Sequence, residues 1–120
     1  MIKSYRDLIV WQKAMRLVEV IYYLTNTFPE KEKFSLTSQL RRAAVSIPAN
    51  IAEGRGRGTR KDFSKFLRIA FGSKAELETL LEISFRLKYI DRNNCNEALS
   101  LTVEVSKMLT KMIRQLTSTS

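Results

Sequence analysis

Residues 36–54 have the sequence LTSQLRRAAVSIPANIAEG, in which apolar side chains recur with the period of a helix. At 100° per residue, one face collects Leu36, Leu40, Ala43, Ile47 and Ile51. We therefore predict an amphipathic helix that ends at Gly54 and whose first free amides are capped by hydroxyls near residues 35–37. Pro48 lies inside this helix and lacks an amide, so a kink or a local widening is expected there.

Three further segments show the same period, at about residues 7–26, 60–89 and 96–116. Gly and Pro together are 6 of 120 residues, and neither a strand pattern nor an internal repeat is present, which argues against a β-sandwich or a β-barrel. The connections between the four helical segments are short. The sequence therefore predicts an all-α fold, a single domain over residues 1–120 that forms an antiparallel, up-down-up-down four-helix bundle.

The predicted third helix has more apolar surface than one core contact needs. One side of it carries Phe63, Phe66, Leu67, Ala70, Leu77, Leu81, Ser84 and Phe85. A second stripe carries Ile69, Leu80, Ile83 and Leu87. A helix packed on one core needs an apolar arc of only about 100°. The surplus predicts self-association, although a central helix in a larger bundle would show the same pattern.

The predicted first and last helices supply the rest of the core. On the first helix the apolar positions are Leu8, Val10, Trp11, Ala14, Met15, Leu17, Val18, Ile21, Tyr22 and Leu24. On the last helix the inward positions are Leu99, Val103, Ser106, Leu109, Ile113 and Leu116. Thr59 is the expected N-cap of the third helix, and Asn93 or Asn94 that of the fourth.

The residue inventory excludes several kinds of chemistry. Without His there is no imidazole base, no Ser-His-Asp triad and no His metal ligand. The lone Cys95 can form neither an internal disulfide nor a thiolate zinc site. Glu53 is the one carboxylate placed to act as a base, and it has no companion acid at a suitable spacing. We therefore expect a protein that is not an enzyme and that needs no metal and no cofactor.

Charge is the strongest functional signal. The 21 Lys and Arg residues outnumber the 12 Asp and Glu residues, which gives a net charge of +9. The cations cluster after Gly54 and form a row at i, i+4 and i+7 on the last helix, although solvated faces of this kind are common without a ligand. The predicted nucleic-acid-binding residues are Arg55, Arg57, Arg60, Lys61, Lys65, Arg68, Lys107, Lys111 and Arg114. Exposed aromatic side chains that could stack on bases are not evident, so contacts to phosphates are expected to dominate.

A polar stripe runs beside the apolar face of the predicted second helix. Its members are Gln39, Arg42, Ser46, Asn50 and Glu53. Because buried polar groups are paired, we interpret this stripe as a hydrogen-bonded network that fixes the helix around Pro48.

Three stretches carry a family resemblance: SIPANIAEG at residues 46–54, DLIVWQKA at residues 7–14 and QLRRAAV at residues 39–45. With them the chain resembles the bacterial four-helix-bundle family first described from intervening sequences in 23S ribosomal RNA genes, often labelled S23 ribosomal protein. The accessory variability protein of diversity-generating retroelements is in the same family. The resemblance covers about residues 5–115, and its motif includes Ser46, Pro48, Asn50, Glu53 and Gly54.

The resemblance implies a four-helix protomer that assembles into a cyclic pentamer. For the retroelement members it also implies binding to nucleic acid and to a reverse transcriptase. The first 17 residues scatter charges among the apolar side chains, so we expect neither a signal peptide nor a membrane span, and a cytoplasmic location.

These observations lead to a functional hypothesis: a non-enzymatic, basic homo-oligomer that engages RNA or DNA backbones. The alternative is a protein-interaction scaffold that docks a reverse transcriptase or another protein, with nucleic-acid contact incidental. A small-molecule enzyme is disfavoured by the residue inventory.

Overall fold

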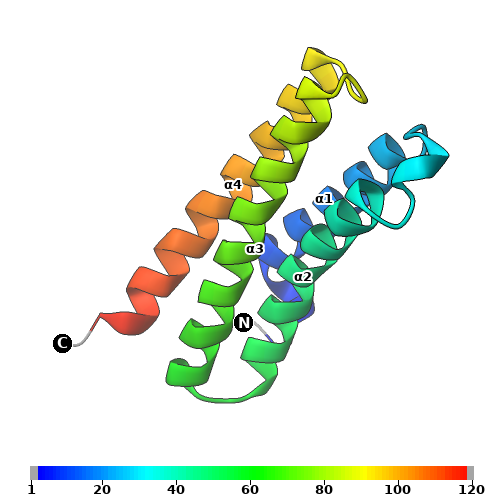
Figure 1. Cartoon of the computed structure of the whole chain (residues 1–120). Helices are drawn as coiled ribbons and strands as arrows, with labels where there is room; N and C mark the ends of the chain where they lie inside the picture. Colours follow the sequence, from blue (N-terminus) through cyan, green and yellow to red (C-terminus); the bar gives the residue numbers. More distant parts are fainter. Residues whose placement is uncertain (1–2, 119–120) are drawn as a thin grey trace.

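The computed structural model describes residues 3–118, and its regular structure is helical throughout (Figure 1). The α-helices are α1 (Ile9–Thr25), α2 (Leu36–Gly56), α3 (Arg60–Arg86) and α4 (Arg92–Thr117), with the short 3₁₀-helices η1 (Tyr5–Asp7) and η2 (Glu30–Glu32). No strand occurs in residues 3–118, so the predicted all-α class is confirmed. The molecule is elongated, measuring 49 × 21 × 21 Å.

The four helices pack around one core. Each helix contacts its neighbour in sequence, and α1 also contacts α4. The two hairpin-like pairs α1–α2 and α3–α4 diverge toward the η2 end, and α3 and α4 extend further than the other two helices (Figure 1). Fully buried side chains such as Leu17, Ile47, Leu77 and Leu109 come from all four helices, so the core needs the whole chain to form.

The predicted apolar face of α2 is confirmed, because all five of its residues are buried. The helix runs to Gly56, two residues beyond the predicted end, and continues through the buried Pro48 without a break. The predicted hydroxyl cap is wrong. The Ser35 hydroxyl instead donates to the Glu32 carboxylate at 2.6 Å, and the other contact of that carboxylate oxygen is the Leu36 amide at 3.4 Å.

The turn between α3 and α4 lies earlier than the sequence suggested. Thr59 caps α3 as expected, with its hydroxyl accepting from the Asp62 amide at 3.1 Å. The helix ends at Arg86 because Lys88 adopts the left-handed backbone conformation, at a φ of 68°. The N-cap of α4 is Asp91, which accepts from the Asn94 amide at 2.8 Å. Neither predicted asparagine is the cap, since a carboxylate was available sooner.

The buried face of α4 is rotated from the predicted one. Val103 is 42% exposed, whereas its neighbour Thr102 is fully buried. The Thr102 hydroxyl donates to the Leu99 carbonyl at 2.6 Å, so this polar side chain can enter the core with its hydrogen bond made. The buried positions of α4 are Cys95, Ala98, Thr102, Val105 and Leu109.

The second apolar stripe of α3 divides between the core and the surface. Leu80 is buried, but Ile69, Ile83 and Leu87 are exposed. The single chain therefore leaves part of this stripe without a protein partner among residues 3–118, and the predicted self-association stays a prediction. No helix within the described residues is long and apolar enough to cross a membrane.

A hydrogen bond between η2 and the α3–α4 turn predicts a pH-dependent stability. The Tyr89 hydroxyl donates to Glu32 Oε2 at 2.8 Å. The hydrogen bonds from Ser35 and Tyr89 lower the pKa of Glu32 below its ordinary 4.5, and the bond to Glu32 raises the pKa of Tyr89 above its ordinary 10.0. Because folding lowers the pKa of Glu32, the ionised carboxylate stabilises the fold fully above about pH 4.5. Because folding raises the pKa of Tyr89, the protonated phenol stabilises the fold fully below about pH 10.0. Both contributions are therefore complete between these two pH values.

We therefore expect Tyr89→Phe to lower the melting temperature at neutral pH. The difference from the unmodified protein should shrink as the pH falls through the folded pKa of Glu32, or rises through that of Tyr89. Thermal unfolding followed by circular dichroism at a series of pH values measures this, with Tyr23→Phe, which alters an exposed ring, as the control. A difference that is constant at every pH would contradict the prediction.

Candidate nucleic-acid interface

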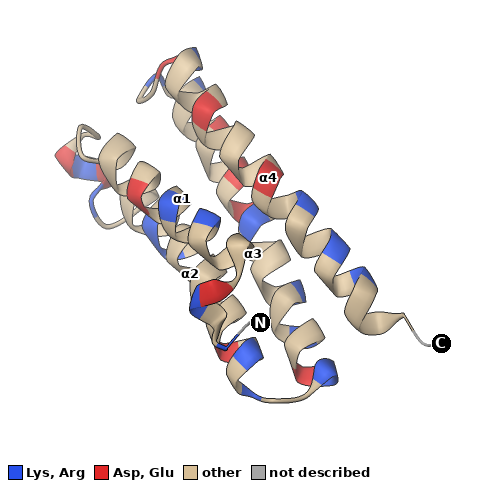
Figure 2. Cartoon of the chain, turned by 180° about the vertical axis from the view of Figure 1, so that it is seen from behind, with Lys and Arg blue, Asp and Glu red and all other residues tan. Residues whose placement is uncertain are grey.

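Most of the net charge lies at one end of the molecule. Residues 53–72 and 105–118 contain nine of the 21 Lys and Arg residues and two of the 12 Asp and Glu residues, so they hold +7 of the net +9. The first segment includes the start of α3, and the second is the C-terminal half of α4. Figure 2 shows basic positions along this half of α4 and near the start of α3, while the acidic positions of α4 lie in its other half.

Of the nine predicted cations, Arg57 and Arg60 have contacts within the fold and Arg55 is partly buried. Arg57 donates to Glu53 at 2.7 Å and lies 4.9 Å from the centre of the Phe66 ring; the bond to Glu53 raises the pKa of Arg57 further above its usual range. Arg60 donates at 2.9 Å to the carbonyl of Gln115 and so joins the start of α3 to the end of α4. Arg55 is half-buried. The contacts of Arg57 and Arg60 compete with a phosphate, and the partial burial of Arg55 restricts access to it.

The other six cations are exposed. They are Lys61, Lys65 and Arg68 on α3, and Lys107, Lys111 and Arg114 on α4. None of them has a carboxylate within 4.0 Å among the residues that the structure describes. Each set has i, i+4, i+7 spacing and therefore follows one side of its helix. We call these six residues the basic rows.

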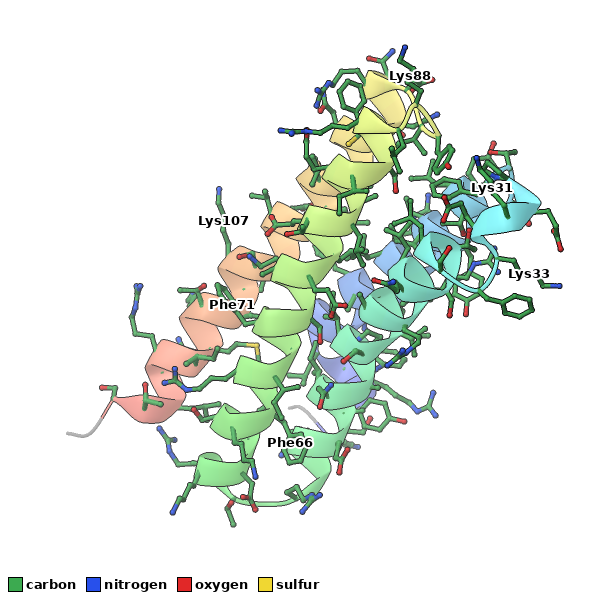
Figure 3. All side chains as sticks on the ribbon, in the orientation of Figure 1. Lys31, Lys33, Phe66, Phe71, Lys88 and Lys107 are labelled. Carbon is green, nitrogen blue, oxygen red and sulfur yellow. The ribbon has the colours of Figure 1, made fainter. Side chains whose placement is uncertain are left out.

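One residue of each basic row, Arg68 and Arg114, lines a groove between α3 and α4, which we call the α3–α4 groove; the four lysines do not line it. It has a volume of about 440 Å³, and its lining residues are Arg68, Phe71, Thr110, Ile113, Arg114 and Thr117. Figure 3 shows Phe71 on the side of α3 that faces α4, and Lys107 extending away from the protein. The groove thus joins two guanidinium groups from different helices to a half-buried aromatic ring and an isoleucine.

Two motif residues of α2, Ser46 and Asn50, form a hydrogen-bonded group where α2 packs against α3. Ser46 Oγ lies 2.8 Å from Ser73 Oγ of α3, and the Asn50 amide donates to Ser46 Oγ at 2.9 Å and to its carbonyl at 2.8 Å. This confirms a polar network next to Pro48. The prediction was wrong for Gln39, Arg42 and Glu53, which are exposed and outside this network; Glu53 instead accepts from Arg57.

Aromatic side chains are exposed, contrary to the expectation from the sequence. Phe34 is 90% exposed and Tyr23 is 77% exposed. A groove of about 830 Å³ near the η2 end is lined by Phe34, Tyr22, Arg41 and Arg42, among others, and we call it the η2 groove. The Arg41 guanidinium lies 4.5 Å from the centre of the Tyr22 ring. Phe34 stands between Lys33 and Ser35 in a polar connection, and this isolation was the signal in the sequence.

The remaining groups that the sequence analysis singled out are the Cys95 thiol and the Glu53 carboxylate. Burial raises the pKa of the Cys95 thiol, which points at the Leu81 carbonyl with a sulfur–oxygen distance of 3.8 Å. Residues 3–118 hold no group of three or more His, Cys, Asp or Glu side chains that could bind a metal ion. Glu53, the one candidate base, is paired with Arg57.

The fold and this surface define a small all-α protein of four helices with one strongly basic end. The chain belongs to the 23S rRNA-intervening sequence protein family, whose model matches residues 6–111. It is also similar to a crystal structure of a protein of unknown function from the S23 ribosomal protein family of Bacteroides thetaiotaomicron, at 29% identity and a TM-score of 0.80. That match covers 88% of this chain and 96% of the other. No curated protein matches the chain.

Proposed function

We propose that this protein is a non-enzymatic, cytoplasmic four-helix bundle with antiparallel, up-down-up-down helices that binds RNA or DNA backbones through its basic end. The observation that carries the proposal is the concentration of +7 of the net charge in two segments that meet in space. Cations that already have carboxylate partners gain little from a phosphate. The six residues of the basic rows have no such partner among residues 3–118.

The mechanism is replacement of the counterions that surround nucleic-acid phosphates. Each Lys or Arg that neutralises a phosphate releases condensed cations, and the gain in entropy supplies most of the affinity. The planar guanidinium groups of Arg68 and Arg114 can each bind two phosphate oxygens at once, while the four lysines act as point charges. Contacts of this kind do not depend on base sequence.

Oligomerisation would multiply these contacts. The exposed apolar residues Ile69, Ile83 and Leu87 of α3 support self-association, because an apolar stripe of this kind is covered in most soluble proteins. The family resemblance implies a pentamer, in which each protomer would bring its own basic rows to one nucleic acid. Linked sites bind more tightly than single sites without any new contact.

The test of the proposal is the salt dependence of affinity for a short structured RNA and a DNA duplex of similar length. If the basic rows bind phosphates, log affinity should fall linearly with log salt, with a slope of about −4 to −5 per protomer if all six cations are engaged. Light scattering in the same buffers measures the mass of the binding species. An absence of binding at low salt would overturn the proposal.

A second candidate function is a protein-interaction scaffold, and the η2 groove is the observation that favours it. Aromatic and arginine side chains dominate the energy of protein interfaces, and Phe34, Tyr22 and Arg41 lie together there. On this hypothesis the ligand is a reverse transcriptase or another protein, and nucleic-acid contact is incidental. A flat salt dependence together with undetectable nucleic-acid affinity is the result that this function predicts.

A further inference from the structure

The α3–α4 groove has a composition that phosphate binding alone does not require. Besides Arg68 and Arg114, its lining includes Phe71 and Ile113, so two guanidinium groups share the groove with an apolar surface. A patch that contacts only the outside of a duplex gains nothing from such a surface. Its volume of about 440 Å³ is within the range of small-molecule sites, about 300–1,000 Å³.

We propose that the α3–α4 groove binds one unstacked nucleotide of a single-stranded nucleic acid, with its base on Phe71 and Ile113 and its phosphate held by Arg68 and Arg114. The inference rests on the proposed function and adds the class of nucleic acid. The structure thereby assigns a preference for single strands over duplexes, which the charge of the basic rows does not supply.

The position of Phe71 suits this role. The Lys74 ammonium lies 4.3 Å from the centre of its ring and is itself bonded to Glu78 Oε1 at 3.0 Å. Lys74 is buried, so its contact holds the Phe71 ring in place. The ring therefore loses little conformational entropy when a base contacts it. Every base has a flat apolar face, and contact of that face with an aromatic ring is favourable whatever the sequence.

The polar groups at the edge of the groove complete the match to a nucleotide. Thr110 Oγ1 has no hydrogen-bond partner in the described part of the chain and can donate to a base or a sugar. The Thr117 hydroxyl is used within α4, where it donates to the Ile113 carbonyl at 2.8 Å. In a duplex the bases are stacked and paired, so their faces are unavailable to a groove on a protein surface.

The first experiment uses the unmodified protein and three probes with equal numbers of phosphates. The probes are a short oligothymidylate, an abasic strand and a duplex. We expect the oligothymidylate to bind at least about fivefold more tightly than the abasic strand, which corresponds to roughly 1 kcal/mol for one base on an aromatic surface. Fluorescence anisotropy of labelled probes at one salt concentration measures the three affinities.

The second experiment fills the groove without changing its charge. Thr110→Trp places a large side chain in the groove and should abolish the advantage of the oligothymidylate over the abasic strand. Ser100→Trp is the matched control, because Ser100 is an exposed residue of α4 outside the groove. Circular dichroism and light scattering show whether both variants keep the fold and the mass of the unmodified protein.

The outcomes separate this inference from the proposed function. Equal binding of the oligothymidylate and the abasic strand would overturn the inference and leave backbone binding intact. A loss of the parent mass in Thr110→Trp alone would also overturn it, since a second copy of the chain would then occupy the groove. Absence of binding to all three probes would overturn the proposed function itself.

Discussion

Replacing Gly54 with alanine is expected to lower the free energy of unfolding by about 1–3 kcal/mol. A Cβ at this position would lie 2.6 Å from the Cβ of Phe66 and 3.2 Å from Cδ1 of Phe63. Both contacts come from α3, so the clash is between two helices and not within one. The Phe66 Cβ is attached directly to the backbone and cannot rotate away. The two helices must therefore separate, and the core contacts between them weaken.

Gly72→Ala is the matched control for this experiment. Gly72 lies within α3, is exposed, and has no atom within 4 Å of an added Cβ. Because glycine is a poor helix former, this substitution should raise stability by about 0.5–1 kcal/mol. Chemical denaturation of both variants gives the two free energies. Equal effects of the two substitutions would mean that close approach at Gly54 does not matter.

Neutralising Arg68, Lys111 and Arg114 together with glutamine should weaken nucleic-acid binding by about 10- to 1,000-fold at low salt. Each residue that contacts a phosphate contributes about 0.7–0.9 to the slope of log affinity against log salt, so the slope should become shallower by about two to three. The substituted side chains are exposed, which predicts an unchanged fold. Titration of labelled RNA and DNA at several salt concentrations measures both quantities.

The control variant removes equal charge elsewhere, by changing Lys31, Arg86 and Lys88 to glutamine. Lys31 and Lys88 lie at the ends of the molecule away from the basic rows (Figure 3). If binding depends on total charge alone, the two triple substitutions will weaken binding equally, and the assignment of the basic rows is then wrong.

A third variant with Arg55, Arg57 and Arg60 changed to serine should affect stability as well as binding, because Arg60 holds the end of α4.

The class of fold could be predicted from the sequence because helical periodicity is a local property. All five predicted core residues of α2 are buried, since a strong apolar stripe has one way to face a core. The apolar pattern of α4 did not by itself indicate which face of the helix is buried. There the small residues Ala98 and Thr102 entered the core in place of Val103, because the packing of α4 against its neighbours selected the face.

The helix ends were predictable only where a single residue was suited to cap. Thr59 met that condition, and the predicted N-cap of α3 was right. Before α4, Asp91 and two asparagines within three residues of it are all suited to cap, and the predicted asparagine cap was wrong. For Phe34 the sequence showed only its isolation in a polar connection, which did not decide whether the ring is exposed. A phenylalanine in a short connection can turn inward or outward, and the direction depends on the space that η2 and α2 leave.

Composition and helical period need no partner, and they were enough to predict the four helices, the apolar face of α2 and the identity of the cations. The availability of those cations depends on how the helices pack. Arg57 and Arg60 became occupied by Glu53 and by the end of α4, whereas Arg68 and Arg114 came together across a groove. The physical reason is that the availability of a charge depends on which groups packing places within a few ångströms of it, and residues 68 and 114 meet only when α3 packs against α4.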